Sequence, residues 1–331
     1  MRRREFITLL GGAAAWPLGA RAQKPEQMRR IAFVHPSTAT MAELRAGPFR
    51  AFLEELGRLG YVEGQNLTVE LFSAEGKREH FAELAHDVVR LNPDAILTMG
   101  QPMALRLKSA TSTIPIVAGT GDPVHGGLVA SLARPGANIT GVSIDAGMDV
   151  YGKRLGLLKE AIPGLARMSF LASRPNWQDF EGPTVREAAQ RVDISLVGSL
   201  VDDPMQEADY RRAFAAIAQE GVDAILVGTN IDNWSNRRLI VELAGKARLP
   251  TMFVWREPVE LGGLMAYAFD LRELWRHAAR QIDQILKGTN PGDIPFYQAT
   301  KFEFVINLKT AKTLGLTIPP GILLAADEVI E

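Results

Sequence analysis

The sequence predicts an α/β fold built from two doubly wound lobes, in which helices cover both faces of parallel sheets. Short β-branched runs alternate with amphipathic stretches of helical periodicity from residue 30 onward, and this order is typical of parallel sheets. The same order begins again near residue 149, and DAILTMG (94–100) is echoed by DAILVGT (223–229). The chain has 331 residues, and this length exceeds what one compact core usually holds. Its hydrophobic share of 47% is sufficient for buried cores. We therefore expect two similar lobes rather than one long sheet.

The first lobe begins with the buried run RIAFV, which we expect to form a strand. Turn signals at Gly60, Asn92-Pro93 and Pro135-Gly136 separate several of the elements that follow. The expected strands are 30–34, 67–72, 94–99, 115–119 and 138–143, and the expected helices are 43–59, 78–91, 102–110 and 126–133.

The second lobe repeats this alternation. Its expected strands are 168–172, 194–200, 223–228 and 251–255, and its expected helices are 149–161, 180–191, 207–219 and 235–247. After the segment 262–270 come an amphipathic helix at 271–287, a strand at 302–306 and a helix at 308–316. Two consecutive lobes do not need this last part, so we expect it to cross back and join them.

Residues 1–22 have the three parts of an export signal. Arg2, Arg3 and Arg4 form a positively charged head, and the apolar stretch Ile7–Ala20 is shorter than the roughly 20 residues that span a bilayer. Ala20-Arg21-Ala22 places small residues where a signal peptidase cleaves. The order R-R-E-F-I (3–7) matches the twin-arginine pattern. We expect a twin-arginine signal peptide, removed near Ala22, and a periplasmic protein; the general secretory route and a disordered basic tail are the alternatives.

Charge and composition argue against several classes of function. The net charge of −1 offers no basic excess for nucleic acid, and the lack of cysteine excludes disulfides, thiolate metal sites and cysteine nucleophiles. The chain has no G-x-x-x-x-G-K-[ST] phosphate loop and no H-E-x-x-H metal helix. Of its five scattered histidines, His35 and His125 fall in loops expected at a cleft. We expect no catalytic residue, no cofactor and no metal site.

In doubly wound sheets, the loops at the carboxyl ends of the strands line the ligand crevice. Short hydrogen-bonding residues recur in these loops, where hydroxyls and free backbone N–H groups can hold a carboxylate. They are Ser37, Thr38, Thr120, Ser173, Thr229 and Asn230. Trp177, Trp234 and Trp255 also fall at strand ends, and we expect a stacking surface there. Arg256 can pair with a ligand carboxylate in a bidentate manner or bridge to acidic side chains on the surface.

Three long stretches identify a family resemblance. They are LEELGRLGYVEGQNLTVELFSAEGKREHFAELAHDVVRLNPDAI, TIPIVAGTGDPVHGGLVASLARPGANITGVS and TKFEFVINLKTAKTLGLTIPPGILLAADEVIE. In this order they resemble the ABC-transporter substrate-binding protein family, which includes tryptophan-binding, TrpX-like receptors. The resemblance implies a periplasmic binding protein of type I, with two Rossmann-like lobes, a three-crossover hinge and one small molecule enclosed between the lobes. By this analogy lobe 1 consists of residues 28–144 and 268–290, and lobe 2 of residues 145–267 and 291–331.

The resemblance also points to four ligand-binding loops. They match Gly100-Gln101-Pro102, Thr120–Asp122, Arg174–Trp177 and Thr229–Asn233. Gln101, Met103 and the segment 174–177 depart from the residues that are usual in the family, so the identity of the ligand stays open. The expected ligand-binding residues are Ser37, Thr38, Gly100, Gln101, Thr120 and Asp122 in the first lobe, and Asn176, Trp177, Thr229, Asn230, Trp255 and Arg256 in the second.

We expect a solute receptor of an ABC importer that closes its lobes over an aromatic or apolar amino acid or a related carboxylate. Its partners are then the small-molecule ligand and an ABC permease in the inner membrane, with no nucleic acid, and a monomer suits this class. Two alternatives stay open. A ligand sensor for a membrane kinase would read the same closure, and an enzyme would use a pair such as His35 or His125 with Asp122 or Asp145.

Overall fold

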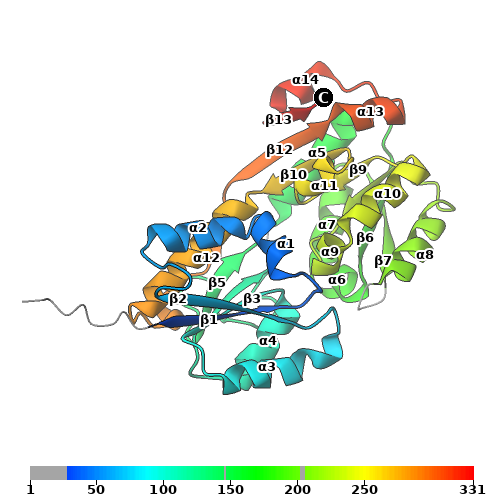
Figure 1. Ribbon diagram of the computed structural model, residues 1–331. Coiled ribbons are helices and arrows are strands. Elements are labelled where there is room, and N and C mark those ends of the chain that lie inside the picture. Colours follow the sequence, from blue (N-terminus) through cyan, green and yellow to red (C-terminus); the bar gives the residue numbers. More distant parts are fainter. Residues whose placement is uncertain (1–27, 145–146, 202–205) are drawn as a thin grey trace, which may run out of the picture.

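The computed structural model describes residues 28–144, 147–201 and 206–331, and they form two α/β lobes (Figure 1). Each lobe contains one sheet, of six strands in the first and seven in the second, within the described residues. The predicted signal peptide at residues 1–22 lies outside the described residues. Among the helices of the described chain, none has the length and apolar character that a bilayer crossing requires.

The first lobe contains a parallel sheet in the order β11-β5-β4-β3-β1-β2. Its strands are β1 (Arg29–His35), β2 (Leu67–Ser73), β3 (Ala95–Met99), β4 (Ile116–Thr120), β5 (Ile139–Ser143) and β11 (Tyr297–Gln298). Its helices are α1 (Met41–Ala46), α2 (Arg50–Arg58), α3 (Phe81–Arg90), α4 (Gln101–Ala110) and α12 (Leu271–Leu286), with short 3₁₀ turns η1 (Arg78–His80) and η2 (Pro291–Asp293).

Helices cover both faces of this sheet. In β1, Ile31 and Phe33 pack against α2 and α12, whereas Ala32 and Val34 pack against α3 and α4. Successive side chains of a strand point to opposite faces, so a sheet covered on both sides needs apolar residues at every position. This requirement explains why the central strands are continuous apolar runs that the sequence predicts correctly.

The second lobe contains a sheet in the order β13-β12-β10-β9-β8-β6-β7, parallel except that β10 and β12 are antiparallel. Its strands are β6 (Arg167–Ser173), β7 (Ser195–Val201), β8 (Ala224–Val227), β9 (Thr251–Phe253), β10 (Met265–Phe269), β12 (Phe302–Asn307) and β13 (Glu328–Ile330). Its helices are α5 (Gly147–Ala161), α6 (Arg174–Asp179), α7 (Glu181–Arg191), α8 (Glu207–Ile217), α9 (Ile231–Ser235), α10 (Arg237–Ala247), α11 (Glu257–Glu260), α13 (Leu308–Leu314) and α14 (Pro320–Ala325). Helices α5 and α7 cover one face, and α8 and α10 cover the other.

Two predicted helices differ from the structure. The helix expected at 43–59 is divided into α1 and α2, because Gly47 is extended and precedes Pro48, which disfavours the helical conformation in the residue before it. The helix expected at 126–133 is a series of turns, in which Gly127 has a φ of 70°. The Gly126-Gly127 pair favours such a left-handed turn over a helix.

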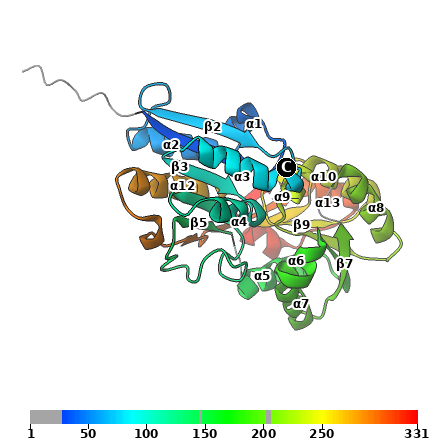
Figure 2. The ribbon, with the colours of Figure 1, turned by 90° about the horizontal axis from the view of Figure 1, so that it is seen from below.

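Three connections join the lobes within the chain: β5 to α5, β10 to α12, and β11 to β12. Figure 2 shows the lobes side by side, with α12 returned to the first lobe next to α2. The expected boundaries need correction at the last crossing. Residues 291–298 belong to lobe 1, because β11 pairs with β5 and because Ile294 and Phe296 are buried in the core of that lobe. Strand β10 stays in lobe 2 as far as Phe269, so the second crossing lies at residue 270.

Candidate functional site

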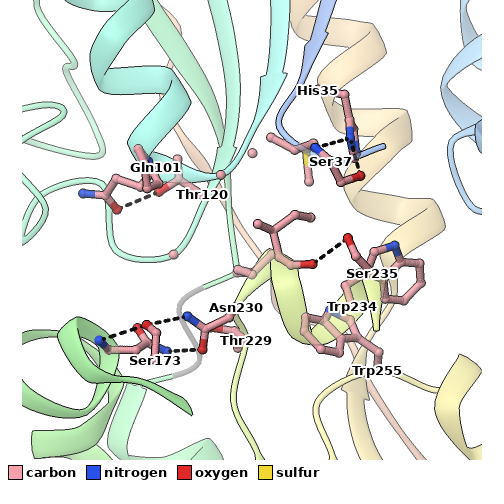
Figure 3. A pocket seen from close by; sticks show the side chains of 18 of the residues that line it. His35, Ser37, Gln101, Thr120, Ser173, Thr229, Asn230, Trp234, Ser235 and Trp255 are labelled. Carbon is pink, nitrogen blue, oxygen red and sulfur yellow. Dashed lines mark hydrogen bonds between the residues drawn. The ribbon is translucent and has the colours of Figure 1, made fainter. Parts of the chain in front are cut away.

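A cleft of about 1200 Å³ lies between the two lobes. Loops that follow β1, β3 and β4 line it on one side, and loops that follow β6, β8 and β9 line it on the other. The carboxyl ends of parallel strands meet at one edge of each sheet, so the two lobes bring their binding edges face to face. Figure 3 shows two groups of side chains at the two ends of this cleft. One end has Gln101, Thr120, Ser173, Thr229 and Asn230, and the other has Trp234 and Trp255 together with His35, Ser37 and Ser235.

Most of the predicted site residues line the cleft. They are Ser37, Thr38, Gly100, Gln101, Thr120 and Asp122 from the first lobe and Asn176, Thr229, Asn230 and Trp255 from the second. The hydroxyl of Thr120 donates to Oε1 of Gln101 over 3.2 Å, which holds this first-lobe pair together (Figure 3). Gly100 has a φ of 86°, a conformation that favours glycine, and it turns the chain from β3 directly into α4.

Asp122 stabilises its own loop. Its Oδ1 accepts hydrogen bonds from the backbone N–H groups of Val124 (2.8 Å) and His125 (2.9 Å). The turn presents the His125 ring to the opposite lobe, where Nε2 lies 2.7 Å from the carbonyl oxygen of Asp179. A second contact between the lobes joins Arg78 to Asp232, with 3.6 Å between Nη2 and Oδ2.

His35, at the end of β1, is 4% exposed and also lines the cleft. Its Nδ1 lies 3.2 Å from the backbone nitrogen and 2.9 Å from the hydroxyl of Ser37. A backbone N–H can only donate, so Nδ1 is the acceptor and the neutral ring carries its proton on Nε2. Burial lowers the pKa of His35 to about 4, which keeps the ring neutral.

The second lobe contributes a connected polar network (Figure 3). Asn230 donates to the hydroxyl of Ser173 over 2.9 Å, and Asn176 donates to Oδ1 of Asn230 over 3.1 Å. Asn176 also donates to the carboxylate of Glu181, which accepts the backbone N–H of Thr229 over 2.9 Å. The junction of β6 and α6, the loop between β8 and α9 and the start of α7 are thereby tied into one surface.

Behind this network lie charged and aromatic groups that the sequence reasoning missed. The Tyr151 hydroxyl donates to Glu181, and the guanidinium of Arg154 lies 5.0 Å from the centre of the Tyr151 ring. Arg154 is fully buried and donates from Nε to the carbonyl of Tyr267 over 2.9 Å. Burial raises the pKa of Glu181 and lowers the pKa of Arg154. The sequence could have indicated Tyr151 as a site residue, because it lies near the start of the helix that follows the first crossing between the lobes. No sequence feature pointed to Glu181 or Arg154.

The aromatic end of the cleft is formed by Trp234 and Trp255, whose ring centres are 5.5 Å apart at 69°. Trp255 is 4% exposed, and it packs in the same cluster as residues of the first lobe, including Trp275 and Phe49. The guanidinium of Arg237 lies over the Trp234 ring at 4.6 Å. This arrangement leaves an apolar recess of rings beside charged side chains.

Two predicted site residues do not line the cleft. Trp177 packs on the core of its own lobe, where Arg186 lies 4.6 Å from its ring and Phe170 is 6.2 Å away. Arg256 pairs instead with three carboxylates of its own lobe, at 2.7 to 3.0 Å; they are Glu260, Glu303 and Glu328. The bidentate ligand contact expected of Arg256 is therefore replaced by an ion-pair cluster within the second lobe.

The described residues contain no group of three or more His, Cys, Asp or Glu side chains placed to hold a metal ion. What the cleft does contain is hydrogen-bonding groups at both ends and two indole rings at one end only. Such a site can hold an amphiphilic small molecule by its polar and apolar ends at the same time.

Comparisons with known proteins agree with this description. The family model "ABC transporter substrate binding protein" matches residues 37–330. The tyrosine-binding protein of Clostridioides difficile (strain R20291) is 24% identical over 269 residues, which cover 81% of this chain and 76% of the relative.

Two solved structures are similar over 92% of this chain and the whole of the other chain. A conserved domain protein from Vibrio cholerae is 27% identical with a TM-score of 0.82. The ABC domain in complex with L-Trp from Streptococcus pneumonia is 25% identical with a TM-score of 0.81. The Clostridioides difficile relative is named a binding protein and the Streptococcus structure holds L-Trp, in agreement with the expectation that the cleft binds its ligand without catalysis. Because the family model spans most of the chain, the protein belongs to the ABC transporter substrate-binding protein family.

Proposed function

We propose that this protein is the exported solute receptor of an ABC importer and that it closes its two lobes over an aromatic amino acid. The observation that carries the proposal is the division of one cleft into a polar end and an aromatic end. The donors of Asn176 and Thr120, which pair with Glu181, Asn230 and Gln101 in this structure, exchange these partners for the carboxylate of an amino acid. The Glu181 carboxylate is then an acceptor for the ligand's ammonium. The Trp234–Trp255 pair matches an apolar ring.

Energy estimates support such a ligand. A micromolar receptor needs about −8 kcal/mol in total. A hydrogen bond to a charged group contributes roughly 1.5–3 kcal/mol, and an aromatic pair adds about 0.5–1.5 kcal/mol beyond area burial. Two or three such hydrogen bonds, one stacked ring and the buried apolar surface are sufficient.

Closure couples binding to transport in this proposal. A ligand that contacts both lobes favours the closed form by its differential affinity for that form. The permease then recognises the closed receptor. The leader-like residues 1–22 support export to the periplasm, and the relatives named for tyrosine and crystallised with L-Trp support the class of ligand.

Calorimetric titration of the chain from Gln23 onward tests the proposal. We expect micromolar or tighter binding of an aromatic amino acid, at least about 10-fold weaker binding of aliphatic amino acids, and none of glucose or inorganic phosphate. The ligand should be recovered unchanged after long incubation. Binding of a sugar alone, or turnover of the amino acid, would contradict the proposal.

A further inference from the structure

Glu257 is a cleft residue with an unsatisfied carboxylate oxygen. It is the first residue of α11, it follows Trp255 by two positions, and it lines the cleft. Its Oε2 is buried and accepts no hydrogen bond from any described residue. A buried acceptor without a donor is unfavourable, and most buried polar groups in proteins have a partner.

The cations near Glu257 are engaged elsewhere. Arg237 is the cation of the neighbouring helix α10 whose charge acts on Glu257, but its guanidinium stacks on Trp234 and its Nη1 donates to the Trp234 carbonyl over 2.8 Å. Arg256 pairs with Glu260, with Glu303 of β12 and with a third carboxylate. The carboxylate thus has positive charge nearby and a hydrogen bond from its own backbone N–H, whereas its buried Oε2 has no partner among the described residues.

The same contacts place Glu257 at the aromatic end of the cleft. Arg237 connects it to the ring of Trp234, which in turn lies 5.5 Å from the ring of Trp255. A ligand ring held by these tryptophans is the part of the ligand that can bring a donor to Glu257. A bare phenyl ring has none, whereas an indole N–H or a phenol O–H has one.

We propose that Glu257 determines specificity by accepting a hydrogen bond from an N–H or O–H group on the ligand's ring, so that the cleft selects indole or phenol rings over phenyl. The inference rests on the proposed function, because it assumes an aromatic amino acid in the cleft. A ligand that donates a hydrogen bond to a buried charged acceptor should bind roughly 10- to 100-fold more tightly than a ligand that leaves this acceptor without a partner. Sites built to bind a substrate hydroxyl or N–H discriminate strongly against analogues that lack it.

The inference has a pH signature. Burial raises the pKa of Glu257 to about 7; the negative charge of Glu260 adds to this, and Arg237 and Arg256 oppose it. The ionised carboxylate is the stronger acceptor. The preference for a donor-bearing ring therefore falls as the pH is lowered from 8 to 6, whereas the affinity for phenylalanine does not fall in parallel.

The test is calorimetric titration with L-Tyr, L-Phe, L-Trp and 1-methyl-L-tryptophan. L-Phe is L-Tyr without its O–H group, and 1-methyl-L-tryptophan is L-Trp without its indole N–H group. Wild type should bind the better of L-Tyr and L-Trp about 10- to 100-fold more tightly than the matching ligand that lacks the donor. Glu257→Leu should bring this ratio to within about threefold of one while retaining the affinity for L-Phe, and Glu257→Gln should give an intermediate ratio. Glu242→Gln, on the neighbouring helix α10 and outside the cleft lining, is the matched control and should keep the wild-type ratio.

The outcomes separate the two proposals. If no aromatic amino acid binds to wild type, the proposed function fails and this inference fails with it. If aromatic amino acids bind but the ratio is unchanged in the Glu257 variants, only the inference is overturned. Should Glu257→Leu not fold, as judged by thermal unfolding, Glu257→Gln and the wild-type ratios at pH 6 and 8 decide; ratios that do not change with pH overturn it.

Discussion

His35 illustrates how burial alone determines the state of a residue in the cleft. The side chain follows a buried strand, and Phe33, two residues earlier, lies edge-on to its ring at 5.5 Å. Desolvation penalises the charged imidazolium, and the hydrogen bond from Ser37 fixes the proton on Nε2. The residue is therefore a neutral donor at the wall of the cleft rather than a titrating base.

This state makes a prediction about stability. The folded pKa of His35, about 4, lies below the unfolded value of 6.5, so the unfolded chain binds more protons between these values and the free energy of unfolding decreases as the pH falls from 6.5 to 4. The largest possible loss is roughly 3 kcal/mol. Denaturant titrations at several pH values should show this decrease in wild type and not in His35→Asn. His80→Asn, on the exposed turn η1, is the control and should show the same decrease as wild type. Parallel curves for wild type and His35→Asn would contradict it.

At the scale of elements, two short helices position the two tryptophans differently. Helix α6 begins at the N-cap Ser173 and directs Trp177 to the core, where a Cβ on Gly198 would collide with the indole. Helix α9 follows β8 and places Trp234 in the cleft next to Trp255. Trp177 and Trp234 both lie in a short helix that follows a strand. Their positions in the helical turn differ, and for this reason Trp177 packs on the core whereas Trp234 lines the cleft.

A pair of alanine variants tests this distinction. Trp234→Ala should weaken binding of an aromatic amino acid at least about 10-fold, because one stacked ring and its buried surface are lost. Trp177→Ala should leave the affinity within about threefold and lower the free energy of unfolding. The decrease should be smaller than the roughly 3–5 kcal/mol of a fully buried aromatic side chain, because Trp177 is only partly buried. Calorimetry and denaturant unfolding measure the two effects. A selective loss of aromatic affinity in Trp177→Ala would reverse the assignment.

The same reasoning separates what was predictable from what was not. Largely apolar runs such as 30–34 and 94–99 predict buried parallel strands, and the rule for carboxyl-end loops then places most of the binding residues. The two-residue strand β11 is too short to show any periodicity. Arg256 could not be assigned because its partners Glu303 and Glu328 are 47 and 72 residues away in the chain.

At the scale of the whole molecule, the lobes touch each other directly across the cleft. The ring of His125 meets the carbonyl of Asp179, and Arg78 of η1 meets Asp232 of α9. Trp255 and Phe269 of the second lobe pack within the core cluster of the first lobe, near the crossings. The relative position of the two lobes is therefore stabilised partly by the protein's own contacts, and a ligand that touches both lobes adds to them.

The Arg78–Asp232 contact joins the two lobes and should therefore contribute to ligand affinity. Arg78 also lines the cleft, whereas Asp232 does not, so Asp232 is the partner to vary. Apparent affinity is the intrinsic affinity multiplied by the fraction of molecules that can close, so removing a contact made only in the closed form weakens binding. An ion pair of this exposure contributes roughly 0.2–1 kcal/mol, which corresponds to about 1.5- to 5-fold in affinity. Asp232→Asn should show this loss together with a larger radius of gyration in solution scattering, whereas Glu54→Gln, which removes the Arg50–Glu54 pair within the first lobe, should show neither. Unchanged affinity and unchanged scattering in Asp232→Asn would mean that closure does not depend on this contact.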